Sequence, residues 1–354
     1  MYLRGFSTAT PQHRYGKAEC LQAFQRSPWF SRLEPRAHLI ASTVLQRDNG
    51  IEARRLAVDS LDEVFDIDPN TLARRFLQHA PVLAAEAGAQ ALARTGLRPT
   101  DIDAVVVSTC TGYLCPGLSG HVVERLGLRS DVRAYDLVGQ GCAAALPNMQ
   151  MGEGLLAARG DGHVLSICVE VSSAAMYLDN DPGVLISACL FGDGAGAAVL
   201  SARKGPASER QLRWTDSASL INPSERQALM FEQRDGMLRN VLSRAVPGLA
   251  ASHAHQVLEQ VLGRAGLLPS DISTWIMHAG GRDVLLALAR RFELSDDAFA
   301  HSAAALREYG NLSSAFVYFV MAAALAANAP AGWWWLSSFG AGFSCHGALL
   351  QMEA

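Results

Sequence analysis

The stretch Tyr135-Asp136-Leu137-Val138-Gly139-Gln140-Gly141-Cys142-Ala143-Ala144-Ala145-Leu146 changes character at its two glycines. Residues 132–137 are predicted to form a β-strand, and the alanine-rich sequence from Cys142 to about Arg159 is typical of a helix. A second strand is expected over residues 163–169. An alternation of apolar strands and helices predicts buried sheets that are covered by helices on both faces.

The same alternation continues through most of the chain. We expect further strands over residues 102–108, 195–200 and 273–277, helices over 118–126, 249–265, 284–292 and 312–327, and a hairpin of 333–338 with 343–351. The polar, turn-rich segment 204–233 is expected to separate two similar halves, 1–205 and 206–354, each with its own sheet. The fold class is therefore α/β, with a site expected where the halves meet.

Composition excludes several classes of protein. The 354 residues are 49% hydrophobic and 18% charged, which is typical of a folded chain with a large core. A net charge of −4 without a basic tail is no reason to expect a nucleic-acid partner. The seven cysteines are irregularly spaced and lack a metal-binding pattern, so we expect reduced thiols, no metal and a cytoplasmic protein.

No targeting or membrane segment is expected. The first residues, Met1 to Gly5, lack the apolar stretch of a signal peptide. The most apolar segment, 315–327, is shorter than the roughly 20 residues that cross a bilayer. We interpret it as a buried helix of a layered core.

Cys142 is placed where a reactive thiol would be useful. Amide groups at a helix N-terminus carry partial positive charge, which favours a thiolate. The neighbouring glycines leave room for a substrate carbonyl to approach the sulfur. A buried structural cysteine is the alternative, and Cys142 alone does not decide between the two.

Two other segments can supply partners for this thiol. In Trp275-Ile276-Met277-His278-Ala279-Gly280-Gly281, an apolar strand delivers a histidine into a glycine-rich turn, at the kind of strand edge where α/β proteins bind ligands. In Tyr309-Gly310-Asn311-Leu312-Ser313-Ser314-Ala315, an asparagine precedes a very apolar helix. The alternatives are a core histidine and an ordinary N-cap asparagine.

Cysteine, histidine and asparagine together suit one reaction. The thiolate takes an acyl group from a thioester. The imidazole N–H and the amide then donate to the thioester oxygen of a malonyl group, which stabilises the enolate formed when carbon dioxide leaves. The resulting carbanion attacks the acyl-cysteine and forms a carbon–carbon bond, without a metal or redox cofactor.

The motifs resemble those of the type III polyketide synthases, the chalcone synthase-like enzymes. The resemblance extends from about residue 5 to the C-terminus. It rests on five ordered motifs: Gly141-Cys142, His278-Ala279-Gly280-Gly281, Tyr309 to Ser314, Leu190-Phe191-Gly192-Asp193-Gly194-Ala195, and Phe339-Gly340-Ala341-Gly342.

The resemblance implies a thiolase-like fold of two αβαβα halves with layered sheets, a homodimer, and repeated use of malonyl-CoA. It also implies that Cys142 is the nucleophile and that His278 and Asn311 promote decarboxylation and condensation. Phe191 matches a gatekeeping phenylalanine. A second such phenylalanine is expected between Gly236 and Pro247, where this chain has none.

Two other functions remain as alternatives. Ketoacyl synthase III of fatty-acid synthesis shares the three residue types, but its histidine is followed by Gln-Ala-Asn, whereas His278 is followed by Ala279-Gly280-Gly281. A thiolase-fold protein that binds acyl thioesters without condensing them would be expected to have an altered triad, and here all three members are present.

The segment Ser108-Thr109-Cys110-Thr111-Gly112-Tyr113-Leu114-Cys115-Pro116-Gly117 resembles bacterial members that accept long fatty acyl starters. Residues 234–243, which include Gly236, are similar to the same group. Cys115 occupies the place of a methionine that forms the dimer-side wall of the cavity in plant members. These resemblances predict a long-chain acyl-CoA starter, several malonyl-CoA extensions, and an alkylpyrone or alkylresorcinol product.

The ring type stays open at this stage. Ser313 and Glu170 match two members of a hydrogen-bonded group that favours aldol closure in the family, and Cys110 takes the place of a threonine hydroxyl. Since a thiol is a weaker hydrogen-bond partner, resorcinol formation is less favoured than lactonisation to a pyrone. Ala341, in the C-terminal turn, completes the predicted substrate-binding residues.

The remaining partners follow from CoA chemistry. Basic residues near the N-terminus match the region where the family contacts CoA phosphates, and acidic residues interleave with them, so a solvated helix face is the alternative. These basic residues are Arg32, Arg36, Arg47, Arg54 and Arg55. Malonyl-CoA and acyl-CoA are the expected substrates, with an acyl carrier protein as an alternative donor of the starter.

Overall fold

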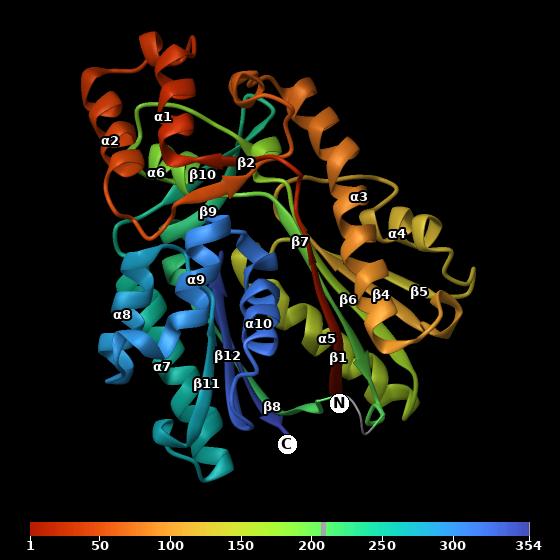
Figure 1. Ribbon diagram of the computed structural model, residues 1–354. Coiled ribbons are helices and arrows are strands. Elements are labelled where there is room, and N and C mark those ends of the chain that lie inside the picture. The colour runs from red at the N-terminus through yellow and green to blue at the C-terminus, as the bar shows by residue number, and fades with distance from the viewer. Residues whose placement is uncertain (207–209, 354) are drawn as a thin grey trace.

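A twisted nine-stranded sheet runs through the computed structural model, which describes residues 1–206 and 210–353 (Figure 1). Its strand order is β11-β12-β13-β8-β1-β7-β6-β4-β5. The strands of this sheet are β1 (Tyr2–Ala9), β4 (Ala104–Ser108), β5 (Arg133–Leu137), β6 (His163–Glu170), β7 (Gly194–Ser201), β8 (Leu212–Ile221), β11 (Ile272–Met277), β12 (Gly332–Gly340) and β13 (Ser344–Met352).

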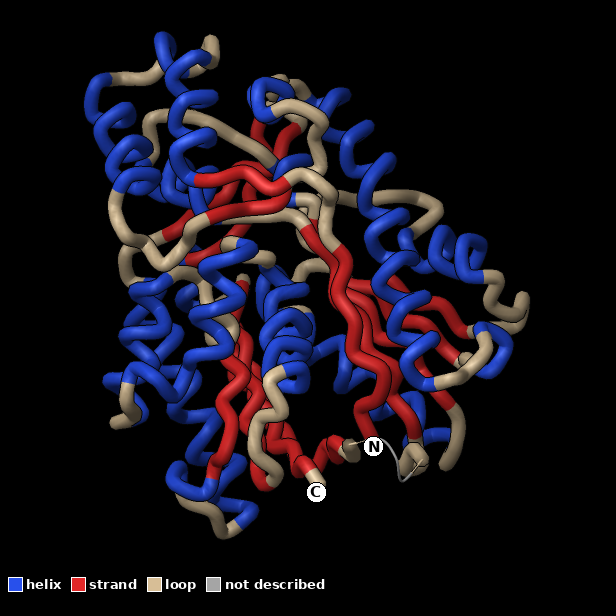
Figure 2. Tube along the Cα trace, in the orientation of Figure 1, coloured by secondary structure: helices blue, strands red, loops and turns tan. Residues whose placement is uncertain are grey.

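Helices cover both faces of this sheet, as Figure 2 shows. The α3 helix packs on β1, β7 and β6, with α4 beside it, and α7 packs on β8 and β13, with α8 beside it. The helices are α1 (Lys17–Arg26), α2 (Pro35–Gln46), α3 (Pro69–Thr95), α4 (Leu118–Leu126), α5 (Ala145–Arg159), α6 (Pro182–Leu190), α7 (Val246–Ala265), α8 (Arg282–Phe292), α9 (Ala300–Tyr309) and α10 (Phe316–Ala326).

Two helices form the central layer between the halves. The α5 helix contacts β4 and β6 as well as β13, and α10 contacts β1 and β7 as well as β11. Both are therefore covered on two sides, which explains why α10 is apolar around nearly its whole circumference. A Cβ atom at Gly196 of β7 would lie 2.3 Å from the Cβ of Tyr318, so the absence of a side chain lets α10 approach the sheet.

Smaller elements form a cap beside the central layer. The cap contains α1, α2, α6 and two hairpins, β2 (Arg14–Gly16) with β3 (Ala53–Arg55) and β9 (Leu229–Arg234) with β10 (Met237–Leu242). In Figure 1 these elements lie together above the ends of the central helices. Among the residues described, no helix has both the length and the apolar character needed to cross a membrane.

The α/β class agrees with the sequence prediction, and the elements predicted from residue 102 onward occur in the expected order. The sequence analysis did not predict α6, β9, β10 and α9, and two stated expectations differ from the structure. The segment 204–233 contains the ten-residue strand β8 rather than only a polar separator. Its buried residues, Leu212, Trp214 and Ala218, alternate with charged and polar ones, which disguised the strand. The halves also do not keep separate sheets, because β1 and β8 pair through Tyr2–Arg213 and Leu3–Leu212.

Candidate active site

Cys142 lies in the 3₁₀ turn Gly141–Ala143, directly before α5. Gly141 has φ +56°, in the left-handed region where glycine carries no steric penalty. A Cβ atom at Gly141 would lie 3.0 Å from both the amide nitrogen and the Cβ of Ala341. Ala341 therefore packs against the turn that presents the sulfur, and a larger residue at either position would displace it.

The thiol of Cys142 is held by a hydroxyl rather than by a helix N-terminus. Burial raises its pKa to about 12, whereas the sequence analysis expected a favoured thiolate. The helix α5 begins only at Ala145, and the effect of burial on the sulfur exceeds that of the hydrogen bond that favours the thiolate. Ser313 Oγ donates a hydrogen bond to Cys142 Sγ at 3.2 Å, which works in the opposite direction and stabilises the thiolate.

His278 follows β11, and its side chain is only 1% exposed. Its backbone N–H donates to Ser337 O at 2.9 Å, which fixes the end of the strand. The imidazole packs edge-to-face against Phe316 and Phe339, with ring centroids 5.5 and 4.9 Å away. Neither ring nitrogen has a hydrogen-bond partner within residues 1–206 and 210–353, and burial lowers the pKa of His278 to about 3. A buried imidazole with two unpartnered nitrogens is suited to contact a ligand.

Asn311 is oriented at both ends of its amide. Its Oδ1 accepts from the backbone N–H of Ser313 at 2.8 Å, and its Nδ2 donates to Gly280 O at 3.2 Å. Its backbone also bridges to Phe191, with Gly192 N donating to Asn311 O at 3.0 Å. An amide nitrogen carries two hydrogens, so one remains available after the bond to Gly280. The capping role and the ligand-facing role are thus both compatible with the structure.

The three residues meet in one cavity of about 730 Å³, which we call the outer cavity. It is lined by Cys142, Phe191, His278, Asn311 and Phe339, among others, and its border includes Arg47, Arg244 and Arg282. The cavity brings together residues from both predicted halves. A thioester carbonyl within it can reach a thiol, an imidazole and an amide N–H.

Burial penalises an isolated thiolate and an isolated imidazolium alike, which accounts for the opposite pKa shifts of Cys142 and His278. With these shifts, the thiol and the imidazole are both neutral near pH 7.

A second set of polar residues lies behind Cys142. Cys110 Sγ lies 3.3 Å from Ser313 Oγ and 3.4 Å from Glu170 Oε1, so a chain of contacts joins Cys142 to a buried carboxyl group. Ser313 has φ +49°, a conformation that costs a non-glycine residue about 1–3 kcal/mol. Such strain is retained where the surrounding contacts determine the geometry, as the bond from Ser313 N to Asn311 does here.

Glu170 accepts hydrogen bonds from several groups around it. Thr111 Oγ1 donates at 2.8 Å, the backbone N–H of Cys110 at 3.0 Å and Thr109 Oγ1 at 3.2 Å, and the Ser314 hydroxyl also donates. Burial raises the pKa of Glu170, and these donors act in the opposite direction. Sequence reasoning found Glu170, Ser313 and Cys110 but missed the two threonines and Ser314, although all three stand next to residues that it had singled out.

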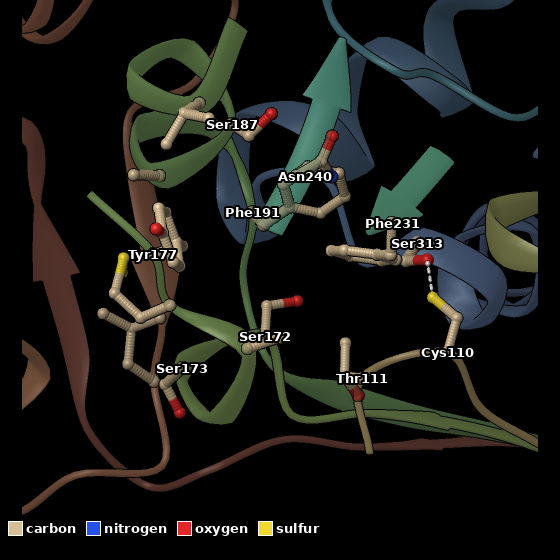
Figure 3. Close-up of a pocket in the computed structure, with 15 residues that line it drawn as sticks. Cys110, Thr111, Ser172, Ser173, Tyr177, Ser187, Phe191, Phe231, Asn240 and Ser313 are labelled. Atoms are coloured by element: carbon tan, nitrogen blue, oxygen red, sulfur yellow. Dashed lines mark hydrogen bonds between the residues drawn. The ribbon is translucent and has the colours of Figure 1, made fainter. Parts of the chain in front are cut away.

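Beyond Phe191 lies a smaller cavity of about 40 Å³, the inner pocket (Figure 3). Cys110, Ser172, Phe191, Phe231, Asn240 and Ser313 line it, among others. Phe191 lines both this pocket and the outer cavity, which is consistent with the predicted gate. The figure also marks the contact between Cys110 and Ser313 at its edge.

Four of the seven predicted substrate-binding residues line neither the outer cavity nor the inner pocket. Glu170 contacts Cys110 and Ala341 packs against Gly141, whereas the other two are exposed. Cys115 is exposed in the loop before α4, and Gly236 is exposed in the turn of the β9–β10 hairpin with φ +77°. Neither lines the outer cavity or the inner pocket. Of the basic residues near the N-terminus, Arg47 borders the outer cavity, whereas Arg54 is buried and donates to the carbonyls of Ala188 and Phe191.

No cluster of three or more His, Cys, Asp or Glu residues that could hold a metal ion occurs within the described residues. All seven cysteines are free thiols.

Comparison with known proteins decides the family. Residues 7–225 match the family model of FAE1/type III polyketide synthase-like proteins, and residues 216–352 match the C-terminal domain of chalcone and stilbene synthases. The chain belongs to the type III polyketide synthase family.

Relatives of this polyketide synthase span nearly its whole length. It is 31% identical to a 1,3,6,8-tetrahydroxynaphthalene synthase of Streptomyces peucetius subsp. caesius over 97% of this chain and 91% of the relative. It is 29% identical to the alpha-pyrone synthesis polyketide synthase-like Pks18 of Mycobacterium tuberculosis, over 90% of this chain and 82% of the relative.

The thiolase-like fold of this polyketide synthase is shared with solved structures. PKS-I from the brown alga Ectocarpus siliculosus superposes with a TM-score of 0.90 at 26% identity, and the match covers 99% of this chain and 98% of that one. The protein is accordingly an acyltransferase-type condensing enzyme that uses malonyl-CoA.

Proposed function

We propose that this polyketide synthase condenses a long-chain fatty acyl-CoA starter with several malonyl-CoA units and cyclises the product to an alkylpyrone or alkylresorcinol. The supporting observation is that Cys142, His278 and Asn311 line one cavity, which shares its lining residue Phe191 with the inner pocket.

The proposed steps use the geometry directly. Cys142 Sγ attacks the starter thioester, CoA leaves as a thiol, and a new thioester holds the acyl group on the enzyme. His278 and the free N–H of Asn311 then donate to the malonyl thioester oxygen while carbon dioxide leaves. The enolate carbon attacks the acyl-cysteine carbonyl, and the thiolate of Cys142 is the leaving group, so the extended chain is now a CoA thioester. For each further extension, Cys142 attacks this thioester again and CoA leaves as a thiol.

An apolar cavity next to the inner pocket favours an alkyl starter. This apolar pocket, also of about 40 Å³, shares Leu56, Met176 and Ala188 with the inner pocket. Its other lining residues include Ala23, Phe24, Leu45, Phe65, Leu178 and Leu185. A long chain would pass from the inner pocket into the apolar pocket by displacing the side chains of Leu56 and Met176, of which methionine is the more adaptable.

The border of the outer cavity suits the phosphates of CoA. Arg47, Arg244 and Arg282 are exposed there, and they come from three separate segments of the chain. Arg282 is also paired with Asp48, at 2.6 Å. We propose that these arginines, rather than the buried Arg54, bind the CoA phosphates.

The cyclisation route follows from the groups around Ser313. The Cys110 thiol stands between Ser313 and Glu170, and burial raises its pKa well above the usual range. A neutral thiol at this position is a weak hydrogen-bond partner for a water molecule that would take part in aldol closure. We propose that pyrones are the main products and resorcinols the minor ones.

The experiment supplies purified enzyme with malonyl-CoA and with acyl-CoAs of graded length, from acetyl to palmitoyl, and identifies products by mass spectrometry. The proposal expects the highest kcat/KM for long chains, and expects Leu56→Phe to shift the optimum to shorter chains. A matched Leu39→Phe substitution, at an exposed position of α2, should leave the optimum in place. A preference for short or aromatic starters would overturn the long-chain proposal.

A second candidate product is a polyhydroxylated aromatic compound, like the tetrahydroxynaphthalene in the name of the Streptomyces peucetius relative. The polar residues of the inner pocket, among them Asn240 and Ser172, favour this candidate. The same assay distinguishes the two, because an aromatic product formed from malonyl-CoA without added starter would favour it.

We also propose that the enzyme is a cytoplasmic homodimer. The edge strand β5 pairs only with β4, and Tyr135 and Val138 at this edge are exposed. Tyr113, in the loop before the adjoining α4, is 77% exposed. A second copy of the chain would cover these side chains and the nearby Cys115. Sedimentation of Val138→Glu should then show a monomer, and a dimer that persists in this variant would argue against the surface.

A further inference from the structure

The inner pocket contains two polar side chains with buried atoms that no described residue satisfies. Asn240 lies on β10, is 9% exposed, and its buried Oδ1 has no hydrogen-bond partner among residues 1–206 and 210–353. Ser172 Oγ is likewise buried and without a partner in that part of the chain. Both residues line the inner pocket, and Figure 3 shows Asn240 above Ser172 around it.

The hairpin geometry explains why Asn240 faces this pocket. Asn240 is paired directly with Phe231 across the β9–β10 hairpin, so both side chains lie on the same face. Phe231 lines the inner pocket too, and Leu242, two residues further along the same face, lines the outer cavity. Asn240 therefore lies on the face of the hairpin whose residues line the inner pocket and the outer cavity.

Neighbouring polar groups in the same pocket behave differently. Ser187 Oγ donates to Gly183 O at 2.8 Å, and Ser173 Oγ donates to the buried Asp193. These hydroxyls are satisfied by the protein itself. Since buried polar groups are nearly always hydrogen-bonded, Ser172 and Asn240 stand out as groups with an external partner.

A growing polyketide chain has the complementary chemistry. A β-dicarbonyl unit exchanges between keto and enol forms, so it offers a carbonyl oxygen as an acceptor and an enol O–H as a donor. The serine hydroxyl can donate to the carbonyl, and the asparagine amide has an acceptor end and a donor end on a freely rotating terminal torsion. An alkyl chain alone would leave both groups unsatisfied.

We propose that Asn240, with Ser172, is a specificity-determining residue that hydrogen-bonds the oxygens of the Cys142-bound polyketide chain and so determines how many condensations precede release. This inference rests on the proposed function. The oxygenated part of the intermediate occupies the inner pocket, and any alkyl tail passes beyond it. Loss of either polar group weakens binding of the longer intermediate, and the chain then leaves earlier as a shorter pyrone.

The test compares product distributions of Asn240→Leu, Ser172→Ala and the double variant, each supplied with malonyl-CoA and the best starter. The ratio of the longest to the shortest polyketide should fall about three- to tenfold for each lost hydrogen bond to a neutral group. Acylation of Cys142 by the starter, measured by protein mass spectrometry, separates a loss of starter loading from a change in the product ratio. Ser7→Ala removes a buried hydroxyl that donates to Gln90 and lines neither cavity, and it should keep the wild-type ratio.

The outcomes separate the two proposals. If no acyl-CoA or malonyl-CoA yields any polyketide with the wild-type enzyme, the proposed function fails. If the wild-type enzyme makes polyketides and folded Asn240→Leu and Ser172→Ala make them in the same ratio, the role of Asn240 is refuted. Ser172→Ala removes a single oxygen, so it keeps the test decisive even if Asn240→Leu lowers the melting temperature.

Discussion

The hydrogen bond from Ser313 to Cys142 allows a quantitative prediction about the reactivity of the thiol. Ser313→Ala removes the 3.2 Å bond to Cys142 Sγ and keeps the backbone bond from residue 313 to Asn311 Oδ1. Serine and alanine both lack glycine's freedom at φ +49°, so the substitution adds little backbone strain. The change therefore removes the hydroxyl donor to Cys142, together with the contact of this hydroxyl to Cys110 Sγ.

The magnitude follows from the energy of a charge-assisted hydrogen bond. A bond to an ionised group contributes about 1.5–3 kcal/mol, and about 1.4 kcal/mol corresponds to one pKa unit. Ser313→Ala should therefore raise the pKa of Cys142 by about one to two units. The thiolate fraction falls in proportion, but each thiolate becomes more nucleophilic with a Brønsted coefficient of about 0.4–0.5. The net rate should fall about four- to fifteenfold.

The assay measures thiol exchange of Cys142 with an aromatic disulfide near neutral pH. Because Cys115 is exposed and would react first, the parent for all variants is Cys115→Ser, and peptide mass spectrometry assigns the adduct. Ser314→Ala is the matched control, since its hydroxyl donates to Glu170. The reasoning would be refuted if Ser313→Ala reacted at the parent rate, or if Ser314→Ala slowed the reaction equally.

Three further predictions concern the pair of donors, acid stability and packing. His278→Ala and Asn311→Ala should each lower carbon dioxide release from malonyl-CoA about 100-fold or more, because each removes a donor to the enolate oxygen; release at the wild-type rate would contradict that role. Burial lowers the pKa of His346 to about 4, so the unfolded chain binds more protons between pH 6.5 and 4 and stability is lost as the pH falls through this range. Between pH 6.5 and 4, the free energy of unfolding measured in urea should therefore fall by about 3 kcal/mol more in the wild type than in His346→Gln. An equal dependence of this free energy on pH in the two proteins would argue against the lowered pKa of His346. Gly196→Ala should destabilise the protein by about 1–3 kcal/mol, because the added Cβ would meet Tyr318, whereas Gly154→Ala, which faces open space in α5, should be neutral or stabilising; similar melting temperatures for the two variants would contradict the packing argument.

The α/β class and the residues that surround the cavity could be read from short segments of the chain. Helices α4 and α7 and the strands around Cys142 and His278 have strong periodicity, and their ends agree with the predictions within a few residues. Strand β8 could not be read, because its exposed face carries charged and polar residues that look like a linker. The first hundred residues, which contain β1 and α1 to α3, received no detailed prediction although they build much of the cap.

The residues of the candidate site also differ in how far local sequence motifs indicate their positions. Cys110, Glu170 and Ser313 were selected from local motifs, and the structure joins them in one hydrogen-bonded group. Gly236 was also predicted from a motif, but it lies in an exposed turn. The prediction differs because a motif does not show on which side of a hairpin a residue lies. Asn240 lies in the segment 234–243 but was not singled out there, and only its pairing with Phe231 places it against the inner pocket.

The sequence by itself determined the α/β class, the family and the chemical identity of the reactive residues, because these are expressed in contiguous motifs and in local periodicity. Tertiary structure alone decided the electrostatics and the recognition surface. Burial, not a helix N-terminus, sets the pKa of Cys142, and Ser313, which lies 171 positions away in the chain, supplies its donor. The unsatisfied groups of Ser172 and Asn240 also become visible only when distant segments close around one pocket, because burial and hydrogen-bond satisfaction depend on neighbours in space.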